Sequence, residues 1–289
     1  MKIVVMTLAN DEICICGRCK KDGRANSYTP MIEAIRKTWA GQDVEGFKSY
    51  YIYGRREGVE PPPGLPMIKT DETYWPGKSA GEGGIPLKVT EKRAPFAVND
   101  CIYSDTPEGR ENLYYKTVDG FAWLLENEDF DYLIRPSAGS YIDCRLFKQF
   151  LDNIGVEDNI YAGSIGNYNN THNSGQPPQI RFASGSGFIA SRNLIQSLVD
   201  NRHTIDPVRS PYASKTISDD VTIAKHFAYE LGVNIIEFPK YQVMSESQCT
   251  PSNVAHQMQC YFVHTIDPRL MYAVHRSKGL ALKEDIRMY

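Results

Sequence analysis

The hydrophobic positions of this chain fall into short continuous runs and longer runs with helical spacing, and the two kinds alternate. The continuous runs are typical of buried strands and lie at "KIVVMTL", "FKSYYIYG", "YLIR", "IYAGSIG", "FASGSGFIAS" and "VNIIEF". The helical runs lie at "TPMIEAIRKTWA", "NLYYKTVDGFAWLLENE", "CRLFKQFLDNIG", "RNLIQSLVDN" and "DDVTIAKHFAYELG". This alternation predicts one α/β domain over residues 1–289, with a mostly parallel central sheet flanked by helices.

Cap and turn residues place the ends of these elements. Thr29 is predicted to cap the first helix, with Pro30 at its first position. Gly54 closes a strand, and Gly155 and Gly232 each follow the end of a helix.

The hydrophobic pattern gives two further local predictions. The chain from residue 56 to residue 86 is rich in Gly and Pro, which predicts irregular structure with one short strand near "PMIKT". The helix within "NLYYKTVDGFAWLLENE" is predicted to bury one face, formed by Tyr115, Val118, Phe121 or Ala122, and Leu125.

Composition excludes several classes of protein. The chain is 42% hydrophobic and 23% charged, which is ordinary for a globular protein, and its net charge of −3 gives no electrostatic reason to expect nucleic acid or an anionic membrane as partner. "MKIVVMTLAN" is too short an apolar run for a signal peptide, and no run approaches the ~18 apolar residues of a membrane span. We therefore expect a cytoplasmic protein. Cys14, Cys16 and Cys19 lack the paired spacing of zinc knuckles, which favours reduced thiols over a metal site.

Two carboxylates and a glycine-rich strand are the first candidates for chemistry. Asp219 and Asp220 begin a helix, where they serve equally well as caps or, for one of them, as a general base facing a cleft. The glycines of "RFASGSGFIAS" permit close approach of a ligand, although a β-bulge is the more common reason for such glycines. The residues of this segment that are candidates to line a cleft are Ser184, Gly185, Ser186 and Gly187.

Two further residues have ordinary structural explanations when each is taken alone. His264 follows an apolar run near the C-terminus, where a lone histidine is more often a core or rim residue than a ligand. Arg36 stands near a helix end, where arginines usually face solvent, but its planar guanidinium also suits a phosphate.

The order of these motifs along the chain resembles the β-1,3-glycosyltransferases that include the galactosyl- and N-acetylglucosaminyltransferases and the Fringe enzymes. "AIRKTW" resembles the stretch after the first strand of that family, and "ENLYYKTVDGFAWLLE" resembles its Asn-Leu-x-x-Lys-Thr helix. "RFASGSGFIASRNLIQSLV" is similar to its Tyr-x-x-Gly-x-Gly segment, and "DDVTIAKHFAYELGV" to its Asp-Asp-Val segment. The matches run from about residue 3 to residue 265.

The resemblance implies a GT-A (Rossmann-like) fold and an inverting transfer of a sugar from a nucleotide sugar, with a UDP-sugar favoured. The residue that matches the family's aspartate before valine is Asp220, which the resemblance assigns as the base. Asp219 is then an N-cap, a contact to an acceptor hydroxyl or the alternative base. The acceptor is a free, lipid-linked or protein-linked glycan. Bacterial or giant-virus proteins of this type lack the Golgi membrane anchor, which implies a cytoplasmic site of action, in the host if the protein is viral.

The family's Asp-x-Asp metal motif is missing here. In "YLIRPSAGSYID", Ser137 and Gly139 stand where the two aspartates are expected, so Mn²⁺ or Mg²⁺ has no carboxylate ligand at that position. Three consequences stay open: metal-free binding of the diphosphate, weak binding of a metal through His264 and the diphosphate, or loss of catalysis. The first two are favoured. The metal-free alternative uses Arg135, Lys116 or Arg36, with backbone N–H groups of the segment 136–140, which includes Ser140.

Two other classes of function remain. A non-catalytic module that binds a nucleotide or sugar with the same fold is favoured by the loss of Asp-x-Asp and disfavoured by Asp219 and Asp220. A nucleotidyltransferase requires a compact basic glycine-rich loop after the first strand, and "MTLANDEICICGRCKKDGR" has basic residues without that signature.

Overall fold

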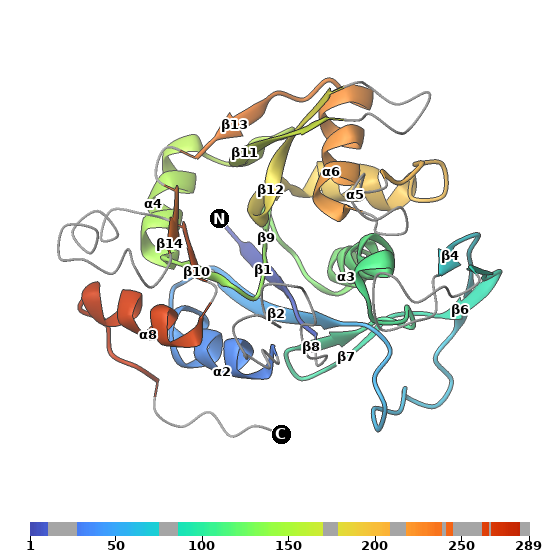
Figure 1. The fold of residues 1–289 in the computed structure, drawn as a ribbon, viewed down its shortest axis with the longest axis horizontal. Helices are drawn as coiled ribbons and strands as arrows, with labels where there is room; N and C mark the ends of the chain where they lie inside the picture. The colour runs from blue at the N-terminus through green and yellow to red at the C-terminus, as the bar shows by residue number, and fades with distance from the viewer. Residues whose placement is uncertain are drawn as a thin grey trace.

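The structure is a computed structural model that describes residues 1–10, 28–74, 86–169, 179–208, 218–238, 241–244, 262–265 and 267–283. Within these ranges the chain forms a central sheet of eight strands (Figure 1). In spatial order the strands are β13 (Ile235–Glu237), β11 (Tyr161–Asn169), β12 (Gln179–Ser191), β9 (Tyr132–Pro136), β1 (Ile3–Leu8), β2 (Phe47–Tyr53), β8 (Cys101–Tyr103) and β7 (Phe96–Val98).

The sheet is mostly parallel. The neighbouring strands β9, β1, β2 and β8 all run in the same direction, and β11 and β13 form a further parallel pair. Strand β12 runs antiparallel to both β9 and β11, and β7 runs antiparallel to β8. The carboxyl ends of four adjacent parallel strands therefore lie along one edge, which is where open α/β sheets bind ligands.

Helices cover both faces of the sheet (Figure 1). One face carries α3 (Leu113–Asn127), α5 (Arg192–Asp200) and α6 (Asp219–Ala224), which continues as the π-helix η3 (Lys225–Glu230). The other face carries α2 (Thr29–Lys37), α4 (Cys144–Ile154) and α8 (Pro268–Ser277). Two 3-10 turns, η1 (Trp39–Gly41) and η2 (Arg110–Asn112), complete the described helices. The predicted α/β class, with helices on a mostly parallel sheet, is confirmed.

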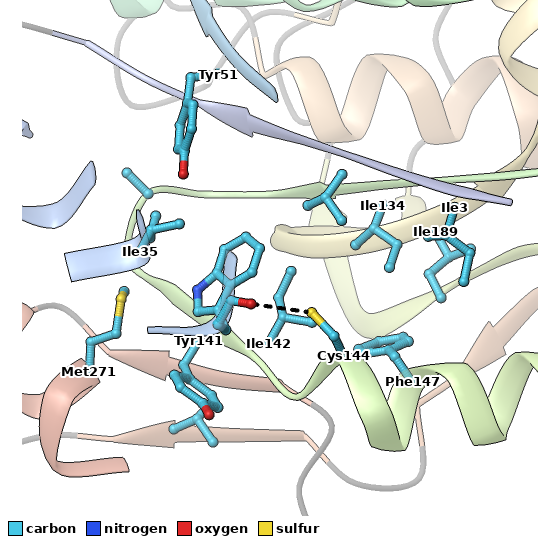
Figure 2. Close-up of a cluster of buried hydrophobic side chains, with 14 of the residues drawn as sticks. Ile3, Ile35, Tyr51, Ile134, Tyr141, Ile142, Cys144, Phe147, Ile189 and Met271 are labelled. Atoms are coloured by element: carbon cyan, nitrogen blue, oxygen red, sulfur yellow. Dashed lines mark hydrogen bonds between the residues drawn. The ribbon is translucent and has the colours of Figure 1, made fainter. Parts of the chain in front are cut away.

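The buried side chains form two cores, one on each face of the sheet. There are two cores because successive side chains of a strand point to opposite faces of the sheet. In strand β1, Ile3 and Val5 belong to one core and Val4 belongs to the other. Figure 2 shows the first core, in which Ile134 and Ile189 of the sheet lie near Phe147 of α4. Burying each such side chain stabilises the fold by ~1.5–3 kcal/mol.

Three smaller sheets border the central one. They are β3 (Met67–Lys69) with β6 (Glu91–Arg93), β4 (Thr73–Tyr74) with β5 (Leu87–Lys88), and β10 (Ser140–Ile142) with β15 (Phe262–Thr265) and β14 (Tyr241–Met244). In the described part of the chain, no helix has the length and apolar character needed to cross a membrane.

Two local predictions were wrong in detail. Thr29 is the first residue of α2, not its cap, since Tyr28 occupies the cap position. The buried face of α3 is centred on Tyr114, Phe121 and Leu124, whereas Tyr115 and Leu125 are only partly buried. This helix packs against α5 and α6 as well as the sheet, so its buried stripe is wide and its centre cannot be fixed from periodicity alone.

Candidate functional site

A cleft of about 250 Å³ lies at the carboxyl ends of β1 and β9. This is the edge of the sheet at which the four parallel strands end. The cleft is lined by Leu8, Ala9, Asn10, Tyr28, Glu108, Gly109, Leu113, Lys116, Arg135, Ser137, Ala138, Gly185 and Asp219. Five of these residues, Lys116, Arg135, Ser137, Gly185 and Asp219, were predicted as site residues, so the fold brings separated motifs together.

A buried ion pair forms one wall of the cleft. Arg135, at the end of β9, donates from Nη2 to Asp219 Oδ2 at the start of α6. Arg135 Nη1 also donates to the carbonyl oxygen of Gly185 at 2.6 Å, and Thr117 Oγ1 donates to Asp219 Oδ2 at 3.3 Å. Asp219 therefore holds the guanidinium of Arg135 in place. The Nε–H of Arg135 is buried and has no hydrogen-bond partner among the described residues.

Asp220 is held differently from its neighbour Asp219. Its Oδ2 accepts from the N–H of Gly185 at 2.7 Å, and its Oδ1 accepts from the N–H of Val221 at 2.9 Å. Burial, and then the adjacent carboxylate of Asp219, raise the pKa of Asp220 to about 6, against the opposing effect of Arg135. Because a carboxylate oxygen accepts two hydrogen bonds, each oxygen of Asp220 retains acceptor capacity.

Residues 184–187 form a bulge that brings the backbone to these groups. The register between β11 and β12 shifts between Gly163 and Ile165, where a single β11 residue faces this longer stretch of β12. The predicted β-bulge is therefore confirmed, and it also contributes to the cleft through Gly185. A Cβ atom at Gly185 would lie 2.9 Å from Arg135 Nη1 and 2.9 Å from Asp220 Oδ2. Only glycine leaves room for both side chains.

Gly185→Ala is expected to lower the free energy of unfolding by ~1–3 kcal/mol, because the added methyl group has to displace Arg135 or Asp220. Urea unfolding measures this change. Ser164→Ala, on the facing strand β11, is the matched control and is expected to change stability by less than ~0.5 kcal/mol. Equal stability of Gly185→Ala and the wild type would show that the bulge relaxes without disturbing the two side chains.

Lys116 also lines the cleft and has a carboxylate partner that the sequence did not reveal. Its Nζ donates to the carbonyl oxygen of Ala9 at 2.9 Å and to Glu108 Oε2 at 2.6 Å. Glu108 Oε1 also accepts from the N–H of Gly54, so this carboxylate ties the end of β2 to α3. No spacing rule links Glu108 to Lys116, because Glu108 lies in an irregular segment before the helix.

The turn between β9 and β10 occupies the place of the missing metal motif. The N–H of Ser137 donates to Ser186 O at 3.2 Å, and the N–H of Ser140 donates to Ser137 O at 3.1 Å. Ser140 Oγ also donates to Ser186 O. Two of the backbone donors expected to bind a diphosphate are thus used inside the protein, which contradicts that part of the prediction. Gly139 lies in the same turn.

The described residues do not fit a divalent metal ion at this edge. No three His, Cys, Asp or Glu side chains come together within the described ranges. Asp143, the first carboxylate after the turn, caps α4 by accepting from the N–H of Leu146 at 3.2 Å, and it pairs with Lys278 Nζ at 3.0 Å. The backbone of His264 lies opposite Ser140 in the pair β10–β15, but its side chain is outside the described part, as are Cys14, Cys16 and Cys19.

Arg36 was predicted to bind the donor and does not line the cleft. Its Nη2 donates to Asp100 Oδ1 at 2.7 Å, and its guanidinium lies 4.6 Å from the centroid of the Tyr51 ring. The prediction treated Arg36 as an unpaired helix-end cation. Its partner is far away in sequence, and the ion pair gives the residue a structural role.

Comparison with known proteins gives distant likenesses only. No protein-family profile matches the chain, and no curated protein is similar to it in sequence. Among solved structures, it is similar to a glycosyltransferase involved in the glycosylation of the major capsid of PBCV-1, with 8% identity, a TM-score of 0.41, and coverage of 97% of this chain and 100% of that one. It is also similar to 2-C-methyl-D-erythritol 4-phosphate cytidylyltransferase from Thermus thermophilus, with 11% identity, a TM-score of 0.37 and the same coverage. Structural neighbours therefore include a glycosyltransferase and a nucleotidyltransferase.

Proposed function

We propose that the protein is an inverting glycosyltransferase that moves a sugar from a nucleotide sugar, with a UDP-sugar favoured, to a hydroxyl of a glycan or glycoconjugate. The carrying observation is the pair of adjacent carboxylates that begins α6, of which Asp219 lines the cleft and Asp220 accepts from the N–H of the lining residue Gly185. Asp219 is committed to Arg135, whereas Asp220 accepts only from backbone N–H groups among the described residues and has a pKa raised to about 6. The sequence resemblance to the β-1,3-glycosyltransferases supports Asp220 as the base, because Asp220 matches that family's aspartate before valine.

In the proposed reaction, Asp220 accepts the proton of the acceptor hydroxyl. The acceptor oxygen forms a bond to the anomeric carbon on the face opposite the leaving group, and the bond from that carbon to the diphosphate oxygen breaks. The electron pair of that bond stays on the diphosphate, so the configuration inverts. A base with a pKa near the working pH suits this proton transfer, because it is deprotonated and still basic enough to accept.

In this proposal, Lys116 and Arg135 stabilise the negative charge of the leaving diphosphate. Both side chains line the cleft, and both already contact a carboxylate, Glu108 and Asp219 respectively. Together with Asp220, these groups amount to two positive and three negative charges. A dianionic ligand therefore has to draw the two cations partly away from their partners. We expect donor binding to be weaker at high salt for this reason.

Thermal stabilisation by nucleotides tests the donor site. A ligand that binds only the folded protein, at ~100 times its Kd, adds ~2.7 kcal/mol of stability, which shifts the melting temperature measurably. We expect one uridine nucleotide or UDP-sugar to raise the melting temperature both with Mn²⁺ and with EDTA. A shift that occurs only with Mn²⁺ would contradict metal-free binding, and no shift with any nucleotide or nucleotide sugar would contradict the transferase.

A non-catalytic binding module is the second candidate, favoured by the absence of carboxylates at Ser137 and Gly139. It predicts the same thermal shift. Product analysis with a panel of sugar acceptors separates the two candidates, because only the transferase releases the nucleoside diphosphate as acceptor is consumed.

A further inference from the structure

A second, smaller pocket lies at the same edge of the sheet as the cleft. It has a volume of about 40 Å³ and follows the carboxyl ends of the parallel strands β2 and β8. It is lined by Arg55, Arg56, Val59, Pro61, Arg93, Ala94, Phe96, Tyr103, Ser104 and Asp105. Three arginines therefore meet in a chain whose net charge is −3.

Among the residues that line the pocket, Asp105 is the one carboxylate beside three guanidinium groups. Asp105 Oδ1 accepts from Arg55 Nε at 3.0 Å, and its carbonyl oxygen accepts from Arg55 Nη2 at 2.9 Å. Asp105 Oδ2 is occupied by the backbone N–H of Arg93 at 3.1 Å. The lining thus has an excess of positive charge. Because like charges held together repel one another, a bound anion lowers the electrostatic energy of the pocket.

Two rings of an aromatic stack, Phe96 and Tyr103, line the pocket. The ring of Tyr103 stacks on Phe96, with centroids 5.4 Å apart and an angle of 28°, and on Tyr53 at 5.8 Å and 22°. The guanidinium of Arg56 lies 5.3 Å from the centroid of the Tyr53 ring. Stacking of this kind fixes the direction of a guanidinium and lowers the entropy that it loses when it binds an oxyanion.

We propose that this pocket binds a single oxyanion group, a phosphate or a carboxylate, carried by an anionic sugar or nucleotide. The volume accommodates one such group and is too small for a whole sugar or nucleotide, so the remainder of the ligand lies outside it. Planar guanidinium groups bind both kinds of oxyanion through paired hydrogen bonds. The proposal does not depend on the transferase activity of the cleft.

The pocket and the cleft share one segment of the chain. Ser104 and Asp105 line the pocket, and Glu108 and Gly109 of the same segment line the cleft. Gly54, whose N–H donates to Glu108, directly precedes Arg55. An anionic ligand in the pocket therefore lies next to the segment that holds Lys116.

Calorimetric titration with inorganic phosphate at low salt tests the proposal. The double variant Arg56→Gln with Arg93→Gln is expected to weaken phosphate binding at least ~10-fold, the loss typical of charge-assisted hydrogen bonds. Arg181→Gln, an exposed arginine of β12, is the matched control and is expected to leave the affinity unchanged. Lys116→Gln shows whether phosphate binds in the cleft instead, because Lys116 lines the cleft and not the pocket.

Each other outcome overturns the proposal. Absence of binding of both phosphate and glucuronate to the wild type removes the site, and equal weakening by Arg181→Gln shows nonspecific attraction. Loss of binding only in Lys116→Gln places the anion in the cleft. Titration with glucuronate and with glucose 1-phosphate distinguishes a carboxylate from a phosphate as the preferred group, and neutral glucose is expected not to bind.

Discussion

Lys92→Met is expected to lower the free energy of unfolding by ~3–5 kcal/mol, the usual effect of removing one member of a buried ion pair. Lys92 Nζ lies 2.7 Å from Glu72 Oε2 and 2.7 Å from Asp119 Oδ1, and all three side chains are buried. Methionine matches the length of lysine, so the loss of packing is small. The two carboxylates left without their cation dominate the result, because each is costly to bury unpaired.

Neighbouring hydrogen bonds add to this effect. Asp119 also accepts from Ser104 Oγ and from Thr106 Oγ1, and Glu72 accepts from Tyr74 Oη. The ion cluster joins β6 to α3 and to the segment that leads into β4, so its loss loosens this side of the sheet. These hydroxyl donors favour the charged carboxylates and do not replace the missing positive charge.

Urea unfolding at neutral pH measures the change. Lys88→Met, an exposed lysine of the adjacent strand β5, is the matched control and is expected to alter stability by less than ~0.5 kcal/mol. A loss below ~1 kcal/mol for Lys92→Met would mean that water reaches the cluster.

The central strands were predictable because they are buried on both faces. Strands β1 and β9 begin with continuous apolar runs, whereas β2 has such a run only at its carboxyl end, and all three lie inside the sheet. Strands β7 and β8 were missed, since each has three residues and neither forms a run that stands out from the loops around it. Their place in the sheet comes from pairing with β2, which local sequence does not encode.

Helix α8 was missed although its signals are present. Asp267 caps it by accepting from the N–H of Arg269 at 2.8 Å, and Pro268 stands at its first position. Leu270, Met271 and Val274 repeat with helical spacing and are buried. A cap followed by proline and such a repeat is the same combination that predicted α2.

For the candidate site, the residues themselves were predictable from the sequence but their interaction partners were not. The motifs that carry Lys116, Arg135 and Asp219 were identified along the chain, and the structure places all three at one cleft. The partners of these residues were not predictable, because ion pairs such as Arg135 with Asp219 join elements far apart in sequence. Arg36 failed as a prediction for the same reason, since its partner Asp100 is remote.

Asp220→Asn is expected to reduce transfer ~10²- to 10⁴-fold, the range typical of a lost general base, with donor affinity nearly unchanged. Asparagine keeps the shape of the side chain and can still accept from the N–H of Gly185, but it cannot take up the acceptor proton. Wild-type kcat/KM is expected to fall as pH drops below about 6, where Asp220 is protonated. Asp158→Asn, an exposed residue before β11, is the matched control and is expected to keep full activity.

The stability of Asp220→Asn separates a lost base from a damaged fold. The pKa of Asp220 is raised in the folded protein from 3.8 to about 6, so its contribution to stability is fully present below pH ~4 and is lost as pH rises through about 6. The neutral asparagine avoids this penalty. The variant is therefore expected to be more stable than the wild type at pH 8, by roughly 1–3 kcal/mol, and the difference is expected to shrink toward pH 4.

Asp219→Asn is expected to behave in the opposite way, because it leaves the buried guanidinium of Arg135 without its carboxylate and destabilises the protein by ~3–5 kcal/mol. Parallel urea unfolding and transfer assays of the two variants compare the roles directly. If Asp220→Asn retains most of the wild-type activity, the base is Asp219 or the mechanism is different. If Asp220→Asn is inactive and more stable at pH 8, the carboxylate is kept at this position for its chemistry at a cost in stability.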